Sequence, residues 1–357
     1  MDLDRYKRQT QLSGFGIEAQ ERLRSAKVLV VGAGGLGVPV CTYLNAMGVG
    51  TLGLVDNDEV SLSNLHRQVL YAEKDIGRSK VAAAFEKLKA QNSDTLLIPH
   101  ETFLTKENAL QTMVGYDLIV DASDNFPTRY LINDACTLLK KPLVYGALHG
   151  FEGQVSVFNY EDGPTYRCLY PTMPKSDEVP DCNENGVLGI LPGIIGNLQA
   201  LEAVKVITGV GEVLSGKLLL FDGLSNSFQK IKFTVKPENL SIRQLRHSYD
   251  FECATGFGSI GADAFLGLVQ SEVPQLIDVR TPVEFARNHI KIAKNIPLSE
   301  LGERHQEMNY DTKTYVVCQS GVRSKKAIGK LLDMHPDAEF INISGGMNQI
   351  QKHGITY

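Results

Sequence analysis

A glycine-rich segment between an apolar run and a helical pattern constrains the fold of this chain more than any other feature. Val28 to Val31 is followed by Gly32-Ala-Gly34-Gly35-Leu-Gly37, which has the spacing G-x-G-x-x-G. Glycines at this spacing allow a tight turn, close approach of the backbone to phosphate and a helix N-terminus aimed at the negative charge. Asp56 follows the next apolar run, Thr51 to Val55, where a carboxylate can accept hydrogen bonds from a ribose. The segment therefore predicts an α/β nucleotide-binding fold, but a dehydrogenase would share all of these features.

Strand-like and helical runs alternate along the first two thirds of the chain. Apolar runs of strand length occupy 27–31, 51–55, 96–100 and 117–120. Such alternation is typical of an α/β fold with a mostly parallel, Rossmann-like sheet. The pattern thins after Val235, and a second alternation begins near Gln275. We therefore predict a first domain over 1–236, a linker over 237–257 and a smaller α/β domain over 258–357.

Composition excludes several classes of protein. A length of 357 residues favours two domains, and 43% hydrophobic with 22% charged residues is ordinary for a globular protein. A net charge of −5 argues against a nucleic-acid partner. We expect neither a membrane span nor a signal peptide, because long apolar runs are missing and the N-terminal residues are charged. The six cysteines are scattered without a disulfide-scaffold spacing, which favours a cytoplasmic location.

Charged side chains in the first domain favour ATP chemistry over redox chemistry. Arg8, Arg67 and Lys80 are candidate cations for phosphate groups. Asp124 follows the apolar run 117–120, at the carboxyl edge of the predicted sheet, and is a candidate ligand of Mg²⁺. A carboxylate that attacks the α-phosphate of ATP needs such cations and little covalent help. The set therefore favours adenylation of a carboxylate.

The second domain carries a cysteine in a loop between a strand and a helix. Cys318-Gln-Ser-Gly321-Val-Arg323 follows the apolar run 314–317 and precedes a helical pattern that starts at Ser324. Backbone N–H groups and the helix dipole at such a place stabilise a thiolate, and Arg323 can add a fixed positive charge. We therefore predict a reactive cysteine at position 318.

From about 258 to 357 the sequence resembles the rhodanese family of sulfurtransferases. The motifs that carry the resemblance are Asp278-Val-Arg280, Glu284-Phe, His289-Ile-Lys-Ile-Ala293, Asn295-Ile-Pro297, the Cys318 to Arg323 loop and Ser344-Gly-Gly-Met347. The resemblance implies that Cys318 carries a persulfide whose anion is stabilised by the loop N–H groups and Arg323. It also implies that Asp278 and Arg280 brace the fold.

From about 3 to 235 the sequence resembles the adenylating enzymes of the ubiquitin-activating superfamily that serve molybdopterin and thiamine biosynthesis. The motifs are Arg5-Tyr-Lys-Arg8-Gln9, the glycine-rich loop, Asp56-Asn-Asp58, Ser63-Asn-Leu-His-Arg67-Gln68, Gly77-Arg-Ser-Lys80, 121–125 and Gly150-Phe-Glu-Gly153-Gln154. The resemblance implies that ATP or its Mg²⁺ contacts Gly35, Asp56, Ser63, Asn64, Arg67, Lys80, Asp124 and Asn125. It also implies that Arg8 reaches the site of a partner subunit, and hence a homodimer.

Two further cysteines are interpreted through the same resemblance. Cys182 lies where the family has its reactive thiol, which forms a thioester with the activated acyl group or resolves a persulfide through a disulfide; an inert loop cysteine is the alternative. Relatives use two Cys-x-x-Cys pairs to hold a structural zinc. Here Thr165 replaces the first cysteine of the pair that ends at Cys168, and 236–243 has no cysteine. Since three of four ligands are missing, we expect no zinc site, and packing or hydrogen bonding in its place.

The two resemblances together imply a sulfur-transfer pathway. The first domain would use ATP and Mg²⁺ to adenylate the C-terminal Gly-Gly carboxylate of a ubiquitin-like sulfur carrier. The persulfide on Cys318, supplied by an upstream donor such as a cysteine desulfurase, would convert the acyl-adenylate into a thiocarboxylate. Fusion raises the local concentration of the sulfur donor.

Two alternatives assign other roles to the chain. A nicotinamide or flavin oxidoreductase with a rhodanese appendage would bind NAD or FAD, and it leaves Arg67, Lys80 and Asp124 without a role. A non-catalytic scaffold would deliver a carrier to other proteins, although the full set of ATP residues argues against it.

Overall fold

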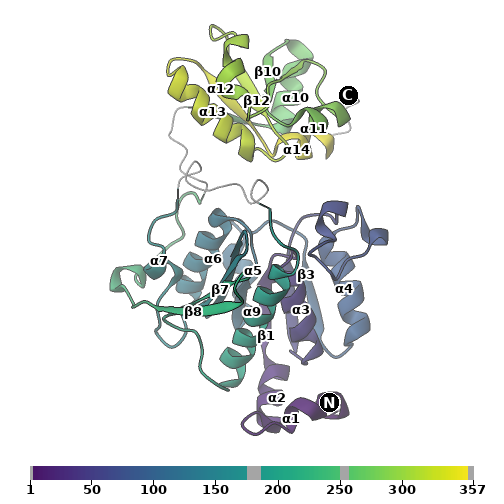
Figure 1. Cartoon of the computed structure of the whole chain (residues 1–357), viewed down its shortest axis with the longest axis vertical. Coiled ribbons are helices and arrows are strands. Elements are labelled where there is room, and N and C mark those ends of the chain that lie inside the picture. Colours follow the sequence, from purple (N-terminus) through teal and green to yellow (C-terminus); the bar gives the residue numbers. More distant parts are fainter. Residues whose placement is uncertain (1–2, 175–185, 250–256, 353–357) are drawn as a thin grey trace. The chain divides into compact units, whose positions relative to one another are not determined.

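The computed structural model describes residues 3–174, 186–249 and 257–352, which form two compact units (Figure 1). The described part of the first unit is 3–174 and 186–249, and that of the second is 257–352. Both are α/β, so the prediction of a Rossmann-like domain and a smaller α/β domain is confirmed. Within the described ranges no helix combines the length and the apolar character needed to cross a bilayer.

The first unit is built on an eight-stranded sheet with the order β3-β2-β1-β4-β5-β6-β7-β8. Its strands are β1 (Lys27–Val31), β2 (Thr51–Val55), β3 (Leu96–His100), β4 (Leu118–Asp121), β5 (Leu143–His149), β6 (Glu152–Phe158), β7 (Lys217–Asp222) and β8 (Ser227–Lys232). The first five strands pair in parallel because helices connect them. β6 to β8 are antiparallel, and a short turn at Gly150, with φ of +57°, joins β5 to β6.

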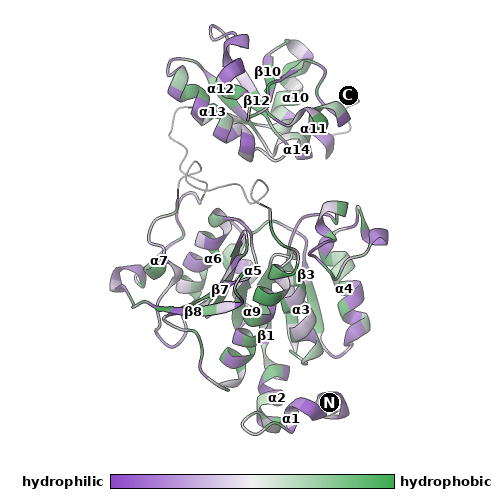
Figure 2. Cartoon of the chain, viewed as in Figure 1, coloured by the Kyte–Doolittle hydropathy of each residue, from purple (hydrophilic) through white to green (hydrophobic). Residues whose placement is uncertain are grey.

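Helices cover both faces of this sheet. They are α1 (Leu3–Thr10), α2 (Gly16–Ser25), α3 (Gly37–Ala46), α4 (Lys80–Gln91), α5 (Ala109–Met113), α6 (Phe126–Leu139), α7 (Tyr166–Leu169) and α9 (Leu191–Thr208). Alternate residues of β1 enter two cores, since Val28 and Val30 pack with α3, α4 and α9 while Leu29 and Val31 pack with α5 and α6. α9 is largely apolar and α1 largely polar (Figure 2), which agrees with the buried position of the first and the exposed position of the second.

The segment 237–249, which the sequence assigns to the linker, lies on the first unit. Asn239 donates a hydrogen bond from Nδ2 to the carbonyl oxygen of Arg167 (3.1 Å). Tyr249 donates its hydroxyl to Asp134 Oδ2 (2.8 Å), and Asp134 also accepts two hydrogen bonds from Arg167. Asp134, Arg167 and Tyr249 are buried, and together with Asn239 they fasten the segment to α6 and α7.

The second unit has a five-stranded, wholly parallel sheet with the order β11-β10-β12-β13-β9. Its strands are β9 (Gly258–Gly261), β10 (Gln275–Asp278), β11 (Ala293–Asn295), β12 (Thr314–Val317) and β13 (Phe340–Ser344). Its helices are α10 (Ala262–Ser271), α11 (Pro282–Arg287), α12 (Leu301–Arg304), α13 (Val322–Met334) and α14 (Gly346–Lys352). Alternate residues of β12 again enter two cores, which leaves Cys318 at the carboxyl end of a central strand.

Candidate active sites and family

The glycine-rich loop joins β1 to α3 at the carboxyl edge of the first sheet. Gly32 has φ of +107°, and a Cβ there would lie 2.6 Å from the carbonyl oxygen of Ala122. A Cβ at Gly37 would overlap the carbonyl oxygen of Gly32. α3 begins at Gly37, so the positive end of its dipole lies at the loop. The loop can therefore bind a phosphate group through its backbone.

Asp56 follows β2 and is hydrogen-bonded to this loop. Its Oδ2 accepts from the N–H of Ala33 (2.7 Å), and its Oδ1 accepts from the N–H of Asp58 (2.8 Å). Burial raises the pKa of Asp56, while the positive charge of Lys80 acts in the opposite direction. Since each carboxylate oxygen can accept a further hydrogen bond, Asp56 is placed to hold a ribose hydroxyl.

Lys80 lies at the start of α4 and is almost fully buried. Its Nζ lies 2.8 Å from Asp58 Oδ2; the side chain of Lys80 is 6% exposed and that of Asp58 is 60% exposed. The pair places the cation near Asp56, two residues away from Asp58 along the chain. The lysine therefore sits beside the nucleotide loop with a carboxylate as its counter-ion.

Arg67 approaches the loop from the turn 62–67. Its Nη1 donates to the carbonyl oxygen of Ser63 (2.9 Å), and a Cβ at Gly35 would lie 3.7 Å from Arg67 Cγ. Asn64 Oδ1 accepts from the N–H of Ser61 (3.1 Å), which fixes the turn. The structure thus brings Gly35, Asp56, Arg67 and Lys80 to one loop, with Ser63 and Asn64 in the turn that carries Arg67.

Asp124 and Asn125 lie beyond the carboxyl end of β4, next to Ala122 and hence to Gly32. Asn125 caps α6, because its Oδ1 accepts from the N–H of Thr128 (2.9 Å), and Asp124 is exposed. No cluster of three or more His, Cys, Asp or Glu residues that could hold a metal occurs in the described ranges. One exposed carboxylate beside a phosphate loop still suits Mg²⁺, which is usually held by one or two carboxylates together with substrate phosphates.

Arg8 does not join this group within its own chain. Tyr6, on the same helix, accepts a hydrogen bond from Asn92 Nδ2 (2.9 Å) and packs against Gly48, which follows the C-terminus of α3. α1 therefore lies near the opposite end of α3 from the glycine-rich loop (Figure 1).

Cys318 lies in the loop between β12 and α13 and is fully buried. Its Sγ accepts a hydrogen bond from the N–H of Gly321 (3.1 Å), and Gly321 has φ of +90°. Behind the loop, Met347 N–H donates to the carbonyl oxygen of Cys318 (2.9 Å), and a Cβ at Gly346 would overlap that oxygen. The glycines of the Ser344-to-Met347 motif thus allow the turn before α14 to close the loop from behind.

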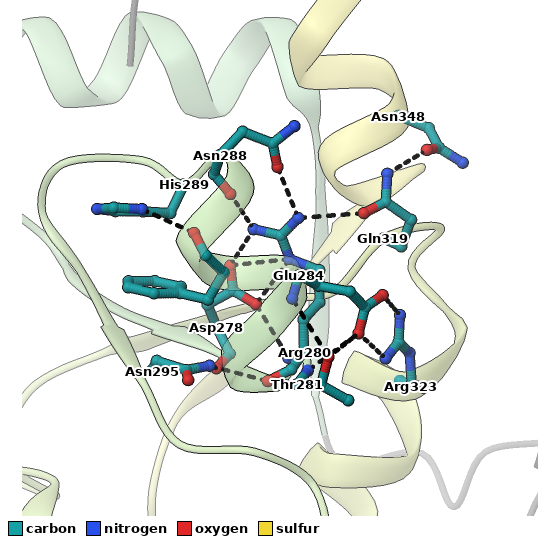
Figure 3. A network of polar contacts seen from close by, with 11 residues as sticks. Asp278, Arg280, Thr281, Glu284, Asn288, His289, Asn295, Gln319, Arg323 and Asn348 are labelled. Atoms are coloured by element: carbon teal, nitrogen blue, oxygen red, sulfur yellow. Dashed lines mark hydrogen bonds and ion pairs between the residues drawn. The ribbon is translucent and has the colours of Figure 1, made fainter.

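A polar network surrounds this loop (Figure 3). Arg323 donates two hydrogen bonds to Glu284, 2.8 Å to Oε2 and 2.6 Å to Oε1. This contact with Arg323 lowers the pKa of Glu284 to about 2, and Thr281 holds the same carboxylate through its N–H (3.0 Å) and hydroxyl (2.8 Å). The predicted cation is therefore held at the loop by a fixed carboxylate.

Asp278 and Arg280 form the buried part of the network. Arg280 Nη2 lies 2.7 Å from Asp278 Oδ2, and Arg280 Nη1 donates to Gln319 Oε1 (3.1 Å), next to Cys318. Asn288 accepts two more hydrogen bonds from Arg280. The pair therefore supports the loop from below, and its side chains are fully buried.

Cys182 lies outside the described residues, as does Cys253. Burial raises the pKa of Cys41 to about 12 and that of Cys136 well above its ordinary value, so both are inert core thiols.

Comparison with known families assigns both units. The model of the ThiF family matches residues 6–242, and that of the rhodanese-like domain matches residues 262–353. The chain belongs to the ThiF family. The resemblances seen in the sequence are thereby confirmed.

Curated relatives of this ThiF-family chain cover both units. Adenylyltransferase and sulfurtransferase MOCS3 from Aedes aegypti is 40% identical over 356 residues, which cover 92% of this chain and 82% of the relative. Sulfur carrier protein adenylyltransferase from Thermus thermophilus is 53% identical over 241 residues, 66% of this chain and 89% of the relative. The crystal structure of Escherichia coli MccB with MccA-N7isoASN matches 66% of this chain and 73% of its own with a TM-score of 0.60 and 22% identity, which supports the fold.

Cys168 is the only one of the four cysteines of the relatives' zinc site that this sequence retains. Its Sγ accepts from the N–H of Lys236 (3.3 Å) and of Thr165 (3.4 Å), and the Thr165 hydroxyl lies 3.4 Å away. The thiol is 4% exposed. Hydrogen bonds to one sulfur therefore connect α7 to the residues after β8.

Sequence reasoning missed Arg129, which is buried beside this ThiF-family nucleotide site. Its Nη2 donates to the carbonyl oxygen of Ser123 (3.1 Å), and its guanidinium lies over the rings of Phe126 and Tyr145. It thus supports the 121–124 turn from below. The sequence could have indicated this residue by its position, because Arg129 lies one helical turn after Asn125, the residue that caps α6.

Proposed function

We propose that the chain adenylates the C-terminal Gly-Gly carboxylate of a ubiquitin-like sulfur-carrier protein and converts it to a thiocarboxylate. The observation that carries this proposal is similarity along nearly the whole chain to a relative named for both adenylyl transfer and sulfur transfer. Each unit also has a loop suited to one of the two steps. The NAD- or FAD-dependent alternative and the scaffold alternative are not favoured.

In the adenylation step, a carboxylate oxygen of the carrier bonds to the α-phosphorus of ATP. Pyrophosphate leaves with the electron pair of the broken P–O bond. Arg67 and Lys80 offset the charge that develops on the phosphates, and the loop around Gly35 binds them through its backbone. Asp56 holds the ribose, and Ser63, Asn64 and Asn125 orient the nucleotide.

Asp124 would hold Mg²⁺ together with phosphate oxygens. When bound, the ion neutralises phosphate charge and orients the leaving group. Asp124 is exposed at the loop edge, as this role requires.

Arg8 would act in the site of a second copy, which makes the enzyme a homodimer. The position of α1 near the C-terminus of α3 supports this assignment, because the glycine-rich loop of the same chain lies at the other end of α3. We propose the domain limits 1–236 and 258–357 with 237–257 as the connection, of which the described part, 237–249, packs on the first unit. Free cysteines at 41, 136, 168 and 318 support a reducing cytoplasm.

In the sulfur-transfer step, the outer sulfur of a Cys318 persulfide attacks the acyl carbon, and AMP leaves with the electron pair. The product is an acyl disulfide between the carrier and Cys318. A thiolate, with Cys182 as the candidate, then attacks Cys318 Sγ, so that the carrier leaves as a thiocarboxylate and a disulfide remains for a dithiol reductant. In the other role open to Cys182, it first takes the acyl group as a thioester. A cysteine desulfurase is the proposed source of the persulfide.

The proposal is tested by exchange of labelled pyrophosphate into ATP in the presence of carriers that end in Gly-Gly. Addition of a sulfur donor should then replace one carrier oxygen with sulfur, as read by mass spectrometry. Absence of exchange with every such carrier would overturn the adenylation. Tighter binding of NAD than of ATP would revive the oxidoreductase alternative, and an Asp124→Ala variant with unchanged turnover would revive the scaffold.

A further inference from the structure

The buried side of Cys318 faces two polar side chains with no assigned role. Ser324 lies in the first turn of α13, and its Oγ is 3.4 Å from Cys318 Sγ. The same Oγ is 2.6 Å from Oδ1 of Asn342 on β13. All three side chains are fully buried, so water cannot substitute for any of these contacts.

The Ser324 hydroxyl has one proton and two neighbouring acceptors. When Cys318 is a thiol, its S–H can donate to Ser324 Oγ, and Ser324 can donate to Asn342 Oδ1. When the sulfur carries no proton, it can only accept. The Ser324 hydroxyl then donates its proton to the sulfur, and the Ser324 oxygen can accept a hydrogen bond from the side chain of Asn342.

Asn342 has such a donor available. Its Nδ2 is buried and has no hydrogen-bond partner among the residues that the structure describes, an arrangement that costs free energy. If the side-chain amide turns over, Nδ2 faces Ser324 Oγ and donates to it. This second orientation pairs the donor, and it moves Oδ1 away from Ser324.

We propose that Asn342, Ser324 and Cys318 form a hydrogen-bond relay whose direction reverses when the cysteine sulfur loses its proton. Ser324 is a catalytic residue because it contacts the reacting sulfur, and Asn342 is a positioning residue that acts through Ser324. The relay rests on the proposed sulfur-transfer function of Cys318.

The relay acts when an S–S bond to Cys318 breaks and its electron pair remains on Cys318 Sγ. In the proposed pathway this happens when the dithiol reductant bonds to the partner sulfur of the disulfide that remains after transfer to the carrier. It also happens when a nucleophile such as cyanide bonds to the outer sulfur of the persulfide. Gly321 N–H stabilises the resulting thiolate from the loop side and Ser324 O–H from the buried side. No proton is transferred, since both donors only share theirs with the sulfur.

The test uses the full chain, loaded with thiosulfate and discharged by cyanide in a single turnover, with thiocyanate as the readout. Ser324→Ala should slow the discharge about tenfold, the effect of one lost hydrogen bond to a charged group. Asn342→Leu should slow it less, about threefold, and should add nothing in the Ser324→Ala background, because it acts only through the serine. Thr314→Ala, which removes a buried hydroxyl at the other end of β12, is the matched control for lost stability.

Three results would overturn the relay: a Ser324→Ala rate equal to that of Thr314→Ala, an Asn342→Leu rate that is unchanged or faster, or additive effects in the double variant. Asn342→Leu keeps the proposal testable if Ser324→Ala does not fold. A wild-type chain that never gains sulfur on Cys318 would instead contradict the sulfur-transfer function itself, and the relay with it.

Discussion

The glycine-rich loop and the Cys318 loop have the same local structure, but their reactive groups come from different parts of the chain. Each follows a buried parallel strand, contains a glycine with positive φ and leads into a helix N-terminus. The glycine-rich loop contributes only backbone groups to the nucleotide site. The charged side chains of that site come from residues 56–80 and from Asp124. The Cys318 loop carries its own reactive atom.

The difference shows how each site depends on the rest of its unit. The nucleotide loop relies on side chains that other strand ends bring to it, and each of those side chains has a local partner, such as Asp58 for Lys80. The cysteine loop relies on close packing from behind by Gly346 and on the network around Arg280. Variants should therefore separate the two activities cleanly.

The largest separation is expected for Cys318→Ser. Sulfur transfer to the carrier should fall by about a thousandfold or more, because the nucleophile is lost. Pyrophosphate exchange should remain at the wild-type rate, because the nucleotide loop is untouched. A parallel loss of exchange would show that the two sites are coupled.

Arg67→Met should lower the rate of pyrophosphate exchange about a hundredfold, since a cation at the reacting phosphates is removed. Discharge of persulfide to cyanide should not change. Lys74→Met removes an exposed cation on the same connection and serves as the control. Equal effects of the two variants would contradict the assignment of Arg67.

Gly37→Ala should destabilise the first unit by about 3 kcal/mol, because the new Cβ overlaps the carbonyl oxygen of Gly32. Calorimetry should show a lower melting temperature for the first unit and an unchanged one for the second. Gly115→Ala, which meets open space, should be nearly neutral.

Glu284→Gln tests the fixed carboxylate at the cysteine loop. Because the pKa of Glu284 is about 2, below its ordinary value of 4.5, its ion pair contributes stability above pH 4.5. That contribution is lost as the pH falls from 4.5 to about 2. The melting temperature of the second unit should therefore decline less with acid in Glu284→Gln than in wild type, whereas Glu303→Gln should match wild type.

A chelator should leave the melting temperature of the first unit unchanged, since Cys168 is held by N–H donors. The Cys168→Ser variant should lower the melting temperature of the first unit slightly. A drop on chelation, together with zinc in the intact protein, would contradict the expected absence of a zinc site.

The sequence predicted the two α/β units because strand and helix periodicity is local. The glycine spacing and Cys318 were found for the same reason: strand, loop and helix are consecutive. The register of β6 to β8 and the packing of 237–249 on α6 and α7 were beyond such reasoning, because they depend on contacts far apart in sequence.

Side-chain partners were the part of the site that the sequence could not give. Lys80 and Arg323 were recognised as cations, but their pairing with Asp58 and Glu284 depends on the folded chain. Ser324 was noted only as the start of a helix, and Asn342 carries no motif. Ser324 lies near Cys318 because the loop turns directly into α13, and Asn342 lies near it because β12 pairs with β13.

The buried carboxylate of Asp134 has a consequence for dividing the chain experimentally. A fragment that ends at residue 236 would lose Tyr249, which donates to this carboxylate, and Asn239, which pairs with the backbone of Arg167. It would also uncover the apolar side of α6 against which Tyr249 packs. A soluble nucleotide-binding fragment should therefore be cut no earlier than after Tyr249.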